Sequence, residues 1–72
     1  MPVYRKGTQV RWNWSGATGE GKIVETFTDD VERTIAGSRI KRKASRHEPA
    51  YLIEQEDGAR VLKSRSELER VD

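Results

Sequence analysis

Few residues of this chain could carry out acid–base or metal chemistry. His47 is the only histidine, and there is no cysteine. A serine–histidine–carboxylate arrangement would have to use Ser45 or Ser64, but neither serine lies in a nucleophile-elbow motif or beside an oxyanion loop. One histidine without cysteine also argues against the usual zinc sites. We therefore expect a protein that is not an enzyme, with no metal and no cofactor.

Aromatic side chains are the next candidates for a site, because the face of an aromatic ring attracts cations. One interpretation places Trp14, Phe27 and Tyr51 around a ligand pocket, next to a mobile loop at Ser15–Gly19. The other places Trp12, Phe27 and Tyr51 in the core, because large aromatic residues dominate the energetics of small cores. We favour the second interpretation, with Trp14 as the exception because it ends a strand beside the loop.

A basic stretch gives a competing site. Six basic residues and no acidic one lie between Arg33 and Arg46, whereas residues 48–72 carry four basic and seven acidic residues. Such a block can follow the phosphates of a nucleic acid, with salt-dependent affinity and little sequence preference. The side chains that would do so are Arg33, Arg39, Lys41, Arg42 and Lys43. We favour the interpretation that the block is a solvated hairpin that balances the acidic end, so nucleic-acid binding through residues 33–46 is the alternative hypothesis.

Composition limits the architecture that can position these residues. The chain has 72 residues, of which 33% are hydrophobic and 36% are charged. We expect one domain over residues 1–72 with a thin core, either a monomer or a weak homodimer. Residues 1–6 contain no apolar segment of a signal peptide, and no apolar run is long enough to cross a membrane. A cytoplasmic location without membrane contact is therefore expected, and the lack of cysteine fits it.

A predicted β-hairpin at Tyr51–Leu62 organises the chain. Pro49 precedes it, and Gly58 supplies the positive φ of its turn. The register of the return strand stays open. A two-residue loop would place Leu62 opposite Ile53, and a three-residue loop with a bulge would place Val61 there.

Two further strands are predicted before this hairpin. Residues 9–14 alternate, with Val10, Trp12 and Trp14 on one side, which is typical of a half-buried strand. Residues 20–28 form the second strand, and the change of parity between Ile23 and Val24 indicates a bulge or burial on both faces. Gly21 is expected where another backbone comes close.

A second hairpin and a short helical turn complete the pattern. Residues 31–35 and 39–43 are predicted to pair through residues 36–38 as a hairpin with little apolar surface, which projects or covers an edge. Ser64 and Glu67 have the spacing of a capping box, so one helical turn should follow. These elements predict a small SH3-like barrel of about five strongly bent antiparallel strands.

Three sequence blocks resemble one known family. They are Lys6-Gly7-x-x-Val10-x-Trp12-Asn13, Gly21-Lys22-Ile23-Val24-Glu25 and Ala44-Ser45-x-x-Glu48-Pro49-x-Tyr51-x-Ile53. In this order they resemble the TUDOR domain of hypervirulence-associated proteins, which are small bacterial and fungal proteins. The resemblance implies a Tudor-type barrel and supplies no catalytic residue or ligand. Arg46-His47 departs from the acidic character expected before Glu48, which puts a shared role of this loop in doubt.

The function expected from these observations is a non-catalytic binding module. Its partner would be a protein or peptide, bound at the aromatic end of the barrel or along an exposed edge strand. Nucleic-acid binding is the alternative.

Overall fold

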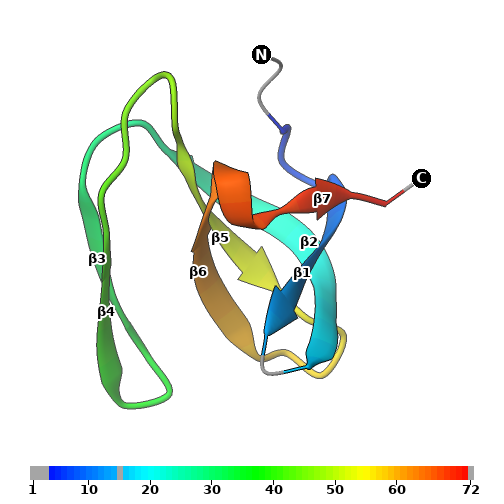
Figure 1. The fold of residues 1–72 in the computed structure, drawn as a ribbon. Helices are drawn as coiled ribbons and strands as arrows, with labels where there is room; N and C mark the ends of the chain where they lie inside the picture. The colour runs from blue at the N-terminus through cyan, green and yellow to red at the C-terminus, as the bar shows by residue number, and fades with distance from the viewer. Residues whose placement is uncertain (1–3, 15, 72) are drawn as a thin grey trace.

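The computed structural model describes residues 4–14 and 16–71, and strands make up most of this part. The all-β prediction is confirmed, with antiparallel strands and one short helical turn near the C-terminus (Figure 1). In chain order, the elements are β1 (Gln9–Trp14), β2 (Ala17–Phe27), β3 (Val31–Ile35), β4 (Ser38–Arg42), β5 (Ala50–Glu54), β6 (Arg60–Ser64), the 3-10 helix η1 (Arg65–Glu67) and β7 (Glu69–Arg70). No helix in the described ranges is long and apolar enough to cross a membrane.

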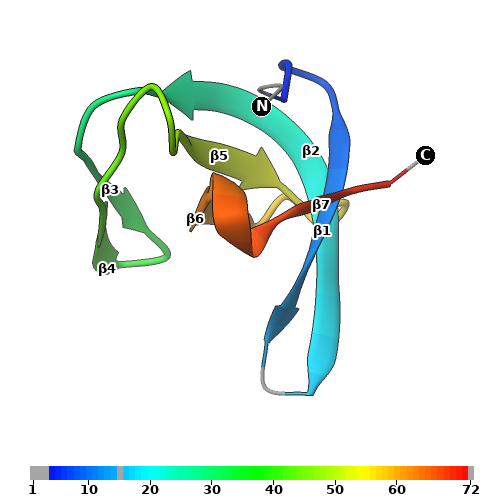
Figure 2. The same cartoon turned by 45° about the horizontal axis from the view of Figure 1, so that its top comes forward.

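The strands form two separate antiparallel sheets. The larger sheet has the order β6-β5-β2-β1-β7, and β3 and β4 form a hairpin of their own. β2 has 11 residues and curves across the molecule, so it bends the larger sheet strongly (Figure 2). The sheet has the strong bend predicted for a small SH3-like barrel, but the barrel is not closed. Its end strands β6 and β7 are joined only through η1, and β7, with two residues, is too short to complete a wall.

The turn between β1 and β2 is tighter than the sequence indicated. Trp14 pairs with Ala17, so only positions 15 and 16 remain for the turn, and β2 begins at Ala17. The prediction of a loop at Ser15–Gly19 is therefore wrong for Ala17–Gly19, although Ser15 itself lies outside the described residues. The small residues Ala17–Gly19 are typical of a loop, but here they pair with β1 and so form part of strand β2.

Two predicted irregularities of β2 are confirmed. The register with β5 shifts between Ile23 and Glu25, which leaves Val24 as a bulge. A Cβ atom at Gly21 would lie 2.6 Å from the carbonyl oxygen of Glu54, so only glycine allows β5 to approach here.

The hairpin of β5 and β6 settles the open register. Ile53 pairs with Val61, and Leu52 pairs with Leu62. The Gly58 amide donates to the Gln55 carbonyl, and Gly58 has a φ of 87°. This is the longer of the two loops considered, a three-residue loop whose last residue is left-handed.

Both faces of β5 are buried, each in a different apolar cluster. Tyr51 and Ile53 point into the curve of the larger sheet, and Leu52 points away from it. We call the first group the inner cluster: Val10, Trp12, Ile23, Tyr51 and Ile53, with Tyr4, Val61 and Leu68 packed against it. We call the second the outer cluster: Val31, Ala50, Leu52 and Leu62, with Val24, Phe27, Ile35, Ile40 and Ala44 packed against it.

The β3–β4 hairpin covers the outer cluster. The prediction that it carries little apolar surface is wrong, because Val31 is 8% exposed and Ile35 and Ile40 are half-buried against β5 and β6. Pairing of Arg33 with Ile40 brings apolar residues of both strands to one face. Counting β3 alone missed the contribution of Ile40 from the partner strand.

The predicted helical turn forms at the end of β6. Ser64 caps η1, and its amide donates to the Glu67 carboxylate over 2.7 Å. Leu68 then packs against the inner cluster, and β7 pairs with β1. The capping spacing therefore identified this turn correctly.

Candidate functional site

Tyr51, one of the three predicted pocket residues, is buried in the inner cluster with no exposed surface. Its hydroxyl oxygen accepts a hydrogen bond from the Tyr4 amide over 3.0 Å, and the two rings contact at a tilt of 53°. Burial raises the pKa of the Tyr51 hydroxyl. Trp12 is also buried, at 4% exposure. Both rings fill the core, and neither ring face is free for a ligand.

Phe27 lies in the other cluster. Its ring packs on the outer side of the sheet, where the Arg33 guanidinium carbon lies 4.7 Å from the ring centroid. The side chain of Trp14 lies outside what the structure describes. The structure therefore does not bring Phe27 and Tyr51 to one pocket, and a ligand-binding role for this set remains a prediction.

The predicted basic residues divide between two faces of the β3–β4 hairpin. Arg39 and Lys41 lie on the face of the hairpin that points away from the outer cluster, where they pair with Thr34 and Glu32. Arg33 and Arg42 lie on the face that covers the outer cluster, because alternate residues of a strand point to opposite sides. The block is continuous in sequence but does not form one continuous basic surface.

Carboxylates accompany most of this block. Nitrogen–oxygen distances are 3.6 Å for Arg33 to Glu25, 3.7 Å for both Arg39 and Lys41 to Glu32, and 3.8 Å for Arg42 to Glu67. The pairs are exposed and add little stability, but they lower the local positive potential. This arrangement makes the hairpin a weaker phosphate-binding surface than its sequence indicated.

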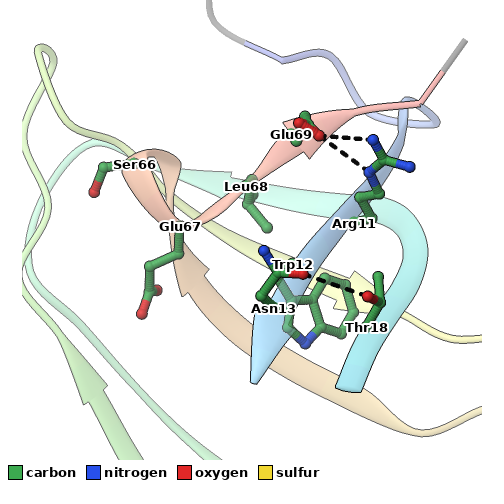
Figure 3. Close-up of a pocket in the computed structure, with 8 residues that line it drawn as sticks. All are labelled: Arg11, Trp12, Asn13, Thr18, Ser66, Glu67, Leu68 and Glu69. Atoms are coloured by element: carbon green, nitrogen blue, oxygen red, sulfur yellow. Dashed lines mark hydrogen bonds and ion pairs between the residues drawn. The ribbon is translucent and has the colours of Figure 1, made fainter. Parts of the chain in front are cut away.

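A polar pocket lies between the end of the β1–β2 hairpin and η1 (Figure 3). Arg11 donates to the Glu69 carboxylate over 2.8 and 3.1 Å, which raises the pKa of Arg11, and Thr18 donates to Asn13 over 3.3 Å. Four of its polar side chains thus pair with one another rather than pointing at a common centre. The lining residues are Arg11, Trp12, Asn13, Thr18, Ser66, Glu67, Leu68 and Glu69.

A groove between the β3–β4 hairpin and β6 has a different character. Half-buried Ile35 and Ile40 of the hairpin face Leu62 of β6 across it, and Val61 borders the groove while packing against the inner cluster. Its volume is about 290 Å³, at the lower end of ligand pockets and enough for a few side chains of a peptide. We call it the hairpin–β6 groove; its lining is Ile35, Ser38, Ile40, Arg42, Arg60, Val61, Leu62 and Lys63.

The edge of β6 borders this groove. Hydrogen bonds from Gln55 to Ala59 and from Arg65 to Pro49 fix which residues of β6 pair with β5. By the alternation of an antiparallel ladder, the amides and carbonyls of Arg60 and Leu62 point away from β5. Leu62 is only 2% exposed and forms the floor, whereas Arg60 is exposed and offers its backbone at one end.

Apart from Arg42, the groove residues were not proposed as a site from the sequence. Two signals could have pointed to them: Val61 and Leu62 are adjacent apolar residues, so one must lie on each face of β6. Arg60 and Lys63 are two of the four basic residues in residues 48–72, which are acidic overall. What the sequence could not show is that the hairpin lies against this strand.

The His47 side chain is exposed in a connector, and within residues 4–14 and 16–71 there is no cluster of three or more potential metal ligands.

Comparison with known proteins gives one match. No curated protein and no solved structure matches the chain. A family model, described as the TUDOR domain of hypervirulence-associated proteins, matches residues 7–68. This range includes all the strands except β7, and both walls of the hairpin–β6 groove. The chain therefore belongs to the family of hypervirulence-associated proteins TUDOR domains.

Proposed function

We propose that the protein is a non-catalytic module that binds a protein segment or peptide in the hairpin–β6 groove. The observation that carries this proposal is the incomplete cover of the outer cluster, where Ile35 and Ile40 stay half-buried along one groove. Membership of a Tudor-type family supports a binding role in general. Neighbouring apolar side chains that are left partly exposed commonly mark interaction sites.

Peptide binding is favoured over nucleic-acid binding for two reasons. The groove is lined by aliphatic side chains and contains no aromatic ring on which a base could stack. The basic residues of the hairpin are split between two faces and lie near carboxylates. A single strand of DNA or RNA would find neither a stacking platform nor a continuous row of unpaired cations there.

Selection from a random peptide library on the immobilised protein tests the proposal, followed by amide NMR with the enriched peptides. The expected shifts lie in β4 and β6. Ile40→Asp should abolish binding, because it places a charge in the groove. Lys41→Asp, the adjacent residue on the opposite face, should not.

The same titration with short single-stranded DNA and RNA, at low and moderate salt, separates the alternative. Salt-sensitive shifts centred on Arg39, Lys41 and Lys43 would favour nucleic acid. Enriched peptides that shift Arg11 and Thr18 instead would place the binding site at the polar pocket of Figure 3.

A further inference from the structure

The charged residues of the hairpin–β6 groove are all of one sign. Arg42, Arg60 and Lys63 line it, and no acidic side chain does. Carboxylates lie just outside the lining, because Glu54 is 3.2 Å from Arg60 and Glu67 is 3.8 Å from Arg42. Among the described residues, no carboxylate lies within ion-pair distance of Lys63. The groove thus combines an apolar floor with a basic rim.

The existing ion pairs leave the arginines able to bind a ligand. The Arg60 side chain is 53% exposed and that of Arg42 is 33% exposed, so both guanidinium groups reach solvent. A guanidinium has five N–H donors, and one carboxylate uses at most two of them in a bidentate pair. Each arginine can therefore donate to a second carboxylate, from a ligand, without breaking the first pair.

We infer that the occupant of the groove is an extended acidic peptide with apolar residues at alternate positions, an inference that rests on the proposed function. Alternate side chains of an extended chain point in opposite directions. Apolar side chains can therefore contact Ile35 and Ile40 while the carboxylates between them reach the basic rim. The amide and carbonyl of Arg60, which point away from β5, add a main-chain contact at one end.

A second copy of this chain fits the groove less well. Two copies related by a twofold axis would bring the same surface together, so that Arg42, Arg60 and Lys63 of one copy would face those of the other. Like charges opposed at an interface are unfavourable, and no acidic lining residue relieves them.

Three heptapeptides test the inference by amide NMR titration and fluorescence anisotropy. In each, valine alternates with one polar residue, which is glutamate, glutamine or lysine. We expect the affinity order glutamate, glutamine, lysine, with shifts in β4 and β6. The double substitution Arg60→Gln with Lys63→Gln should weaken binding of the glutamate peptide roughly fivefold to tenfold, as expected for the loss of two exposed charge pairs.

The matched control is Arg39→Gln with Lys41→Gln. It removes the same charge from the face of the hairpin that points away from the groove, where both side chains are about three-quarters exposed. Binding should change less than about twofold, in line with the small effect of remote, screened charges. A larger loss from this control than from the groove variant would overturn the inference.

The remaining outcomes are equally decisive. Equal affinity for the glutamate and glutamine peptides overturns the acidic ligand but leaves peptide binding in the groove intact. If no heptapeptide and no library peptide shifts the groove, both the inference and the proposed function fail. Single-stranded DNA that shifts the groove amides more strongly than the glutamate peptide would overturn the peptide in favour of nucleic acid. A dimer that forms with rising concentration, and more tightly in the Arg60→Gln/Lys63→Gln variant, would overturn the peptide in favour of a second copy of the chain.

Discussion

The inner and outer clusters share β5 but are closed in different ways. Strands joined by backbone hydrogen bonds surround the inner cluster, and its members are at most 4% exposed. The outer cluster lies under a hairpin that belongs to a separate sheet, and five half-buried apolar residues pack against it, compared with three for the inner cluster. The comparison shows where stability and binding reside. The inner cluster holds the sheet together, and the outer cluster can leave a groove because side-chain contacts alone hold its cover.

Truncation of one isoleucine in each cluster gives the largest expected contrast. Ile53→Ala should lower the free energy of unfolding by about 3 kcal/mol, because a fully buried side chain leaves a cavity. Ile40→Ala should lower it by about 1 kcal/mol, because the half-buried Ile40 side chain buries less apolar surface than Ile53 does. Urea unfolding of the two variants measures this difference. Equal losses would mean that the hairpin is as integral to the core as β5.

A methyl group at Gly21 tests how closely β2 and β5 approach in the larger sheet. The new Cβ would lie 2.6 Å from the Glu54 carbonyl oxygen, so β2 and β5 must separate. Gly21→Ala should cost about 2 kcal/mol, the cost typical of overpacking. Gly58→Ala is the control with a different cause. The new Cβ at position 58 would meet no atom within 4 Å, but the alanine must adopt a φ of 87°, so a loss of about 1 kcal/mol in stability is expected. A milder effect at Gly21 than at Gly58 would contradict the close approach.

Tyr51→Phe examines the one hydroxyl buried in the inner cluster. Loss of the hydrogen bond from the Tyr4 amide should reduce stability by about 1 kcal/mol at neutral pH. The pKa of Tyr51 is raised in the folded state, so its contribution is fully present below the unfolded pKa of about 10. It is lost as the pH rises above that value toward the folded pKa. Unfolding curves of the native protein and the variant should converge in alkali; parallel curves would show that Tyr51 does not titrate with unfolding.

Arg33→Ala should have the smallest effect, because it acts on the outer cluster at an exposed position. Arg33 lies over the Phe27 ring and 3.6 Å from Glu25, with 43% of its side chain exposed. A loss of about 0.5 kcal/mol is expected, and added salt should reduce it. A double-mutant cycle with Phe27→Leu measures the share due to the ring. A coupling above about 2 kcal/mol would mean that this contact is far less solvent-exposed than the structure shows.

Local patterns in the sequence predicted much of the fold. The strand at residues 9–14, the bulge after Ile23, the close approach at Gly21 and the cap at Ser64 are all present. Each depends on neighbours in sequence or on the needs of one residue type. The candidate site was harder to predict, because the hairpin–β6 groove joins residues 35–42 with residues 60–63.

The sequence by itself determined which residues share a face of each strand, where the chain turns, and which family the chain resembles. Only the tertiary structure decided which faces meet. It placed Tyr51 inside the sheet and Phe27 outside it, left the barrel open, and laid the β3–β4 hairpin on β5 and β6. The physical reason is that alternation reports the side of a strand on which a residue lies. The choice between two apolar sides depends on burial summed over the whole chain.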